Sequence, residues 1–137
     1  MELDELVSVL IAEHAKMKEG LAQVRQAISD KDYASASRIL KELDQIFRQH
    51  IADEEAQVLR ILLDAYGVKG SEEAIVVFRQ HRPIYELMEE VKKLASLPVG
   101  ELAGDEDRLW RLFEDHTLAE ESRIFPKAIQ TFKERTS

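Results

Sequence analysis

The sequence contains no cysteine, and this absence removes several kinds of site at once. Disulfide frameworks, thiolate zinc sites and cysteine nucleophiles all need this residue. Any metal ion bound by the chain must therefore be held by nitrogen and oxygen ligands. Glycine and proline are also scarce, at five and three of 137 residues, and the composition of 45% hydrophobic and 34% charged residues is that of an ordered helical protein.

Basic residues are also fewer than acidic ones, at 19 against 27. The formal net charge is −8, and no basic run is longer than Lys92-Lys93. Nucleic acids and anionic membrane surfaces need basic patches, so neither is an expected partner. No apolar run is long enough to span a bilayer, and residues 1–5 are acidic and periodic where a signal peptide would be basic and then apolar. We therefore expect a cytoplasmic protein.

Apolar residues recur at helical spacing through nearly the whole chain, and no strand pattern is present. The pattern predicts helices over residues 3–28, from the polar cluster 29–32 to Tyr66-Gly67, from Ser71 to about residue 96, and from near Asp105 onward. Pro83 should kink the third helix or mark a reset of its first turns, and Pro126 is a possible kink in the fourth. Residues 97–104 form the longest predicted loop. Since 137 residues suit one core, residues 1–137 are predicted to be a single all-α domain, an up-down-up-down antiparallel four-helix bundle.

All four histidines lie on the inward stripes, one on each predicted helix: His14, His50, His81 and His116. If a stripe takes roughly three of seven positions, four independent histidines would all fall there only about 3% of the time. Counting residues from the predicted turns, at roughly 1.5 Å per residue, places all four at a similar height in the bundle. The histidines can therefore meet in its interior.

Two glutamates complete the pattern. His50 and Glu54, like His116 and Glu120, are four residues apart, so each pair shares one helix face directed at the core. Two buried carboxylates are very costly unless paired or bound to metal, and no Lys or Arg lies on these stripes at that level. A pair of metal ions would neutralise them. Imidazole and carboxylate ligands in a helical bundle fit iron or manganese better than structural zinc.

Each element of this pattern has a simpler interpretation when taken alone. A single inward histidine is usually a core residue with satisfied hydrogen bonds, and a single His-x-x-x-Glu pair usually lies on a surface. The adjacent Glu55 and Glu121 point about 100° away from Glu54 and Glu120, which favours exposure to solvent over a bridging role. The combination of four histidines at one height with two repeated pairs favours a metal site.

These residues resemble the hemerythrin family, whose domains bind cations through a His, His-x-x-x-Glu, His, His-x-x-x-Glu series. The matching stretches are His14, His50-Ile-Ala-Asp-Glu54, Gln80-His81-Arg82-Pro83, and His116-Thr-Leu-Ala-Glu120 followed by Ile124-Phe125-Pro126. The resemblance implies a non-haem di-iron centre in which Glu54 and Glu120 bridge the metals. It also implies that His14 and His50 bind one iron and that His81 and His116 bind the other.

The sequence departs from the oxygen-carrying hemerythrins one turn after His81, where Tyr85 replaces a further histidine. The Tyr85 phenolate could ligate ferric iron, or the side chain could pack in the core and hydrogen-bond a bridging carboxylate. Glu86 could reach the metals if Pro83 distorts the helix. Loss of one neutral imidazole favours the ferric state and argues against pure oxygen carriage.

The predicted function is that of a di-iron protein that binds or reacts with oxygen, peroxide or nitric oxide in sensing, detoxification or iron handling. Manganese or zinc is a less favoured cofactor than two iron ions. One alternative is an iron- or oxygen-responsive interaction module without turnover, and another is a metal-free structural bundle. The sequence does not decide between an enzyme and a binding protein, and it does not indicate the oligomeric state.

Overall fold

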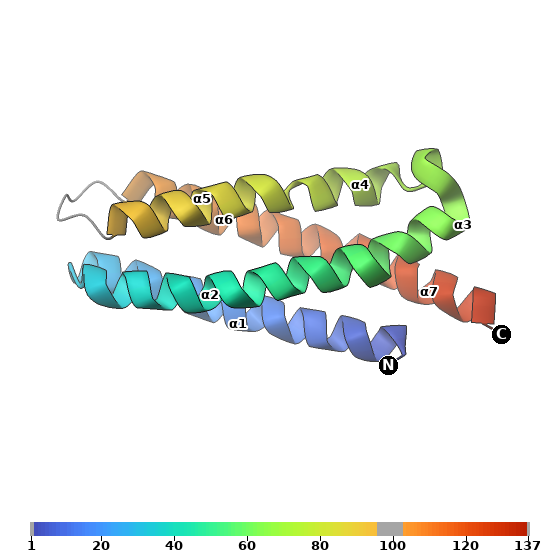
Figure 1. Cartoon of the computed structure of the whole chain (residues 1–137), viewed down its shortest axis with the longest axis horizontal. Helices are drawn as coiled ribbons and strands as arrows, with labels where there is room; N and C mark the ends of the chain where they lie inside the picture. The colour runs from blue at the N-terminus through green and yellow to red at the C-terminus, as the bar shows by residue number, and fades with distance from the viewer. Residues whose placement is uncertain (1, 96–102, 137) are drawn as a thin grey trace.

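The computed structural model describes residues 2–95 and 103–136. Its helices are, in chain order, α1 (Leu3–Ser29), α2 (Tyr33–Asp53), η1 (Glu54–Leu59), α3 (Arg60–Gly70), α4 (Glu72–Arg79), α5 (His81–Ala95), α6 (Ala103–Ala119), η2 (Glu120–Ile124) and α7 (Phe125–Thr136). Consecutive elements join into four long helices that alternate in direction, with both termini at one end of the bundle (Figure 1). The predicted all-α, up-down-up-down four-helix bundle is confirmed.

The four long helices pack as a closed ring around one interior. α1 lies against α2, α2 against α5, α5 against α6, and α6 against α1. Short connections force neighbouring helices to be antiparallel, which produces this order. In the described ranges, no helix combines the length and the apolar character needed to cross a membrane.

The first two connections form where the sequence pattern places them. The Asp32 carboxylate accepts a hydrogen bond from the Ser35 backbone N–H, 3.2 Å away, and caps α2. Gly67 has φ 71° and ψ −177°, a conformation open essentially to glycine alone, and this residue ends the regular part of α3. Ser71 stands at the predicted cap of α4, but its side chain makes no capping hydrogen bond.

Pro83 lies at the start of a new helix and does not kink a continuous one. α4 ends at Arg79 and α5 begins at His81, so Pro83 lies in the first turn of α5, where its missing N–H costs no intrahelical bond. Most of the predicted loop, residues 97–102, lies outside the described residues. Ala103 and Gly104 already belong to α6, which therefore begins slightly before the predicted start at Asp105.

A polar layer divides the core into two apolar clusters. The cluster on the side of the α1–α2 turn includes Met17, Phe47, Ile84 and Phe113. The cluster on the side of the termini includes Leu10, Val58, Phe78 and Phe125. On every long helix the histidine falls between a member of one cluster and a member of the other.

Candidate metal centre

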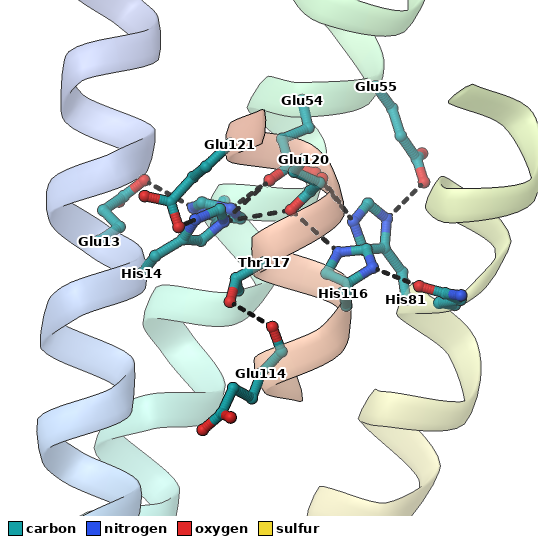
Figure 2. Close-up of polar contacts among 12 residues, drawn as sticks. Glu13, His14, Glu54, Glu55, His81, Glu114, His116, Thr117, Glu120 and Glu121 are labelled. Atoms are coloured by element: carbon teal, nitrogen blue, oxygen red, sulfur yellow. Dashed lines mark hydrogen bonds and ion pairs between the residues drawn. The ribbon is translucent and has the colours of Figure 1, made fainter. Parts of the chain in front are cut away.

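The polar layer consists of the six side chains predicted to lie together. The four histidines are between 1% and 4% exposed, and Glu54 and Glu120 are fully buried. They come from all four long helices, and Figure 2 shows His14, His81, His116 and the two glutamates pointing toward one another. The six residues therefore form one compact cluster in the middle of the bundle.

Within this layer the side chains form two groups that share both glutamates. One group contains His14 and His50 with Glu54 and Glu120, and the other contains His81 and His116 with the same two glutamates. In each group, one ligand atom from every residue lies within 4.8 Å of the others. The ring centroids of His14 and His50 are 4.6 Å apart, and those of His81 and His116 are 4.7 Å apart.

Each carboxylate faces both pairs of histidines. One Glu54 oxygen faces Nε2 of His50 and lies 3.6 Å from Nε2 of His14, whereas the other lies 2.8 Å from Nε2 of His81. Glu120 Oε1 lies 3.2 Å from His14 Nε2 and 3.0 Å from His116 Nε2. Each carboxylate therefore lies between the two pairs of histidines.

The inward atoms of this cluster lack ordinary hydrogen-bond partners. Both carboxylate oxygens of Glu54 and Glu120 are buried without a hydrogen bond, as is Nε2 of His14, His50 and His81. Buried polar atoms are nearly always paired, because an unpaired one costs roughly 1–3 kcal/mol. A set of converging nitrogen and oxygen donors without partners fits bound cations.

Charge is strongly coupled across the cluster. Burial lowers the pKa of His14, but its contacts with Glu120 and Glu54 outweigh burial and raise that pKa to about 9. His81 behaves alike, with the same two glutamates raising its pKa to about 9 against the effect of burial. Burial raises the pKa of Glu54, yet contacts with Glu120 and three histidines hold it well below the usual value. Without metal, protons on His14 and His81 balance the buried carboxylates.

Both glutamates begin a π-helical segment. η1 starts at Glu54 and η2 starts at Glu120, so the wider turn follows each His-x-x-x-Glu pair directly. The buried positions His50, Glu54, Val58 and Leu62 follow one another at intervals of four residues. In an α-helix each such step would drift by about 40°, and the π turn absorbs this drift. A regular α-helix would bring Ile61, seven residues after Glu54, onto the inward face, whereas Leu62 is buried and Ile61 is half-buried.

A second set of side chains contacts the outward nitrogens of the histidines. His50 Nδ1 lies 3.0 Å from a Glu13 oxygen, and His116 Nδ1 lies 3.1 Å from the Gln80 amide oxygen. His14 Nδ1 lies 3.3 Å from Glu121, and His81 Nδ1 lies 3.6 Å from Glu55. Each histidine thus has a side chain from the neighbouring helix beside its outward nitrogen, as Figure 2 shows for Glu121 beside His14 and Glu55 beside His81. The hydrogen bonds to His50 and His116 orient those two rings and direct their other nitrogen inward.

The sequence did not indicate the contacts of Glu13 and Gln80, and for Glu55 and Glu121 it favoured solvent exposure over a bridging role. All four directly precede or follow a residue of the buried layer in the sequence. A residue one step along a helix points about 100° away, toward the adjacent helix. That adjacency was the available signal. Glu55 is 53% exposed and Glu121 is 30% exposed, so both combine contact with solvent and contact with an imidazole.

Tyr85 and Glu86 have partners outside the buried layer. Tyr85 is half-buried, its hydroxyl accepts a hydrogen bond from Arg48, and the Arg48 guanidinium lies 4.9 Å from the centre of its ring. Glu86 is exposed and accepts a hydrogen bond from Arg82 at 3.1 Å.

Aromatic rings enclose the layer on its two apolar sides. Phe78 stacks on His81 with centroids 5.2 Å apart, and Phe125 stacks on His14 at 5.8 Å. Phe47 and Phe113 meet these histidines edge-on at 6.2 Å. Phe47, Phe78 and Phe113 are buried, and the nearby Leu112 is half-buried. Phe125 adds a further ring.

Comparison with known proteins agrees with this geometry. No curated protein and no solved structure matches the chain. The model of the hemerythrin HHE cation-binding domain matches residues 5–128, which include every residue of the buried layer. The chain therefore belongs to the hemerythrin HHE cation-binding domain family.

Proposed function

We propose that this protein is a cytoplasmic non-haem di-iron protein that binds or reacts with a small ligand, namely oxygen, peroxide or nitric oxide. Its role would be in sensing, detoxification or iron handling. In this proposal His14 and His50 hold one ion, His81 and His116 hold the other, and Glu54 and Glu120 bridge the two. The two four-residue groups that share both glutamates are the observation that carries the proposal.

The donor atoms favour iron. All six residues offer nitrogen or oxygen, and the chain has no cysteine to supply the sulfur that many structural zinc sites use. Pairs of carboxylate-bridged iron or manganese ions are held in this way by inward Glu and His residues of four-helix bundles. Manganese and zinc are the alternatives that metal analysis would identify.

The number of protein ligands leaves room for a small molecule. Each group provides four side chains, and iron commonly accepts six ligands. When bound, the metal pair would supply exchangeable coordination positions and changes of oxidation state. The protein's own contribution is an interior shielded from water, since the rings of Phe47, Phe78, Phe113 and Phe125 are buried around the layer.

Iron analysis of the anaerobically loaded protein tests this proposal. We expect one ferrous ion for each of the two groups, and a changed absorption spectrum when oxygen, peroxide or nitric oxide is added. Iron uptake without any response to these ligands would favour the interaction module instead. No uptake of iron, manganese or zinc would leave the metal-free structural bundle as the explanation.

A further inference from the structure

The two metal positions of the proposed centre are not equivalent in their surroundings, although each is built from two histidines and the same two glutamates. We call the metal position of His14 and His50 position A, and that of His81 and His116 position B. We propose that position B is the weaker and exchangeable position, reached from solvent through a groove between the second and third long helices. This inference rests on the proposed function, because it requires two bound ions.

The side chains beside the outward nitrogens of the histidines provide the first observation. In position A both are carboxylates: Glu13 is hydrogen-bonded to His50 at 3.0 Å, and Glu121 lies 3.3 Å from His14 without a hydrogen bond. These carboxylates are only 23% and 30% exposed. A carboxylate partner makes an imidazole a stronger ligand and fixes its orientation.

In position B the side chains beside the outward nitrogens are a neutral amide and an exposed carboxylate. His116 faces the neutral amide oxygen of Gln80 at 3.1 Å. The carboxylate beside His81 belongs to Glu55, which is 53% exposed and lies 3.6 Å away, beyond hydrogen-bond distance. Solvent screens an exposed charge. The rings of position B therefore face a neutral amide and a solvent-screened carboxylate, whereas those of position A face two better-shielded carboxylates.

A surface groove provides the second, independent observation. A groove of about 490 Å³ is bounded by Ile51 and Leu59 on one side and by Ile75, Phe78 and Tyr85 on the other, and His81 lies along it. His81 is also the most exposed of the four histidines, at 4%. Glu55 borders the same groove, so the loosely held carboxylate stands where solvent reaches position B.

A calorimetric titration tests the order of binding. Fe²⁺ is added stepwise to the metal-free protein under anaerobic conditions. We expect two steps of different affinity. His116→Ala should abolish the weaker step and His50→Ala the tighter one, with circular dichroism confirming that both variants keep their helical content. Loss of the tighter step in His116→Ala would overturn the inference.

Substituting the side chains beside the outward nitrogens tests whether they cause the difference in affinity between the two positions. Gln80→Glu should strengthen the weaker step about tenfold, and Glu13→Gln should weaken the tighter step about tenfold, the lower end of typical effects for such partners. Gln23→Glu, an exposed change on α1, controls for the added charge. An effect of Gln80→Glu on the tighter step, or no effect beyond that of Gln23→Glu, would overturn the explanation.

The rate at which a chelator removes iron tests whether ions leave through the groove. Wild-type protein should lose iron in a fast and a slow phase. Ile75→Trp, which narrows the groove, should slow the fast phase, whereas Val76→Trp at the neighbouring exposed position should not. Equal rates in both variants would contradict entry by this groove. A protein that takes up no iron refutes the proposed function and this inference together, whereas two ions bound in one indistinguishable step refute the inference alone.

Discussion

At the scale of single residues, adjacent glutamates have different partners. Glu54 is fully buried and faces three histidines, whereas Glu55 is 53% exposed and lies 3.6 Å from the outward nitrogen of His81. An ionised carboxylate is tolerated in the interior only with strong partners. Glu54 therefore belongs with the proposed ligands, and Glu55 lies outside them.

Substitution of each residue should show this difference in iron content. His50→Ala and Glu54→Ala should each empty at least one metal position, because both remove an inward donor. Glu55→Ala should leave both positions filled. Iron analysis after anaerobic loading measures the outcome, with thermal melting as a check on folding. The reverse ranking would show that Glu55, and not Glu54, bridges the ions.

Spectroscopy can show whether Tyr85 is an iron ligand. Because its hydroxyl already accepts a hydrogen bond from Arg48, we expect Tyr85→Phe to keep the iron content and the visible spectrum of the wild-type protein. A broad visible band that disappears in Tyr85→Phe would identify the phenolate as an iron ligand instead. Arg48→Ala is the matched control, since it frees the hydroxyl without removing it.

At the scale of elements, the π-helical segments align each His-x-x-x-Glu pair with the core residues that follow it. The segment η1 contains the exposed residue Ala56, whose deletion would let the helix continue as regular α-helix. Because a π turn holds one residue more than an α-helical turn, the residues on the two sides of the deletion would keep nearly the same direction relative to each other. We therefore expect the deletion variant to keep its helical circular dichroism and its iron content. Loss of iron in this variant would show that the wide turn itself positions Glu54.

The turn at Gly67 should matter for stability alone. Its φ of 71° and ψ of −177° suit glycine, so Gly67→Ala should lower the free energy of unfolding by roughly 1–3 kcal/mol. Denaturant unfolding measures this change. Iron content should not change, because Gly67 lies outside the buried layer. An unaltered stability would mean that the turn relaxes without cost.

The sequence predicted the helices well and their irregularities less well. Apolar spacing, the polar cluster at residues 29–32 and the turn at Gly67 indicated the bundle, since these features act locally. The four histidines and two glutamates were also predictable, because inward spacing on each helix brings them to one height. The π segments were not, since the shift from Ile61 to Leu62 depends on packing against other helices. The partners Glu13 and Gln80 were missed for the same reason, because each acts on a neighbouring helix.

At the scale of the whole molecule, the metal-free protein should depend on pH through the buried layer. The pKa values of His14 and His81 are raised from 6.5 to about 9, so their stabilising effect is complete below pH 6.5 and is lost as pH rises toward 9. The pKa of Glu54 is lowered from 4.5, so its contribution is present above pH 4.5 and is lost under more acidic conditions. The metal-free protein should be most stable between these limits.

Thermal melting across pH 6.5 to 9 tests this expectation. The metal-free protein should lose on the order of a few kcal/mol over this interval, because protons leave His14 and His81. The iron-loaded protein should change less, since bound ions replace those protons, and iron binding near pH 7 should itself release protons. His14→Gln should flatten the metal-free profile. A metal-free stability that rises between pH 6.5 and 9 would contradict the assigned charges.

The closed ring of contacts joins two halves that carry the same order of donors. The first half, α1 with α2, supplies a lone histidine and then a His-x-x-x-Glu pair with a π turn, and the second half, α5 with α6, supplies the same series. Glu54 of the first half reaches His81 of the second, and Glu120 of the second reaches His14 of the first. Neither hairpin alone can supply both glutamates to its own histidines, so the cluster is complete only when the two halves close on each other.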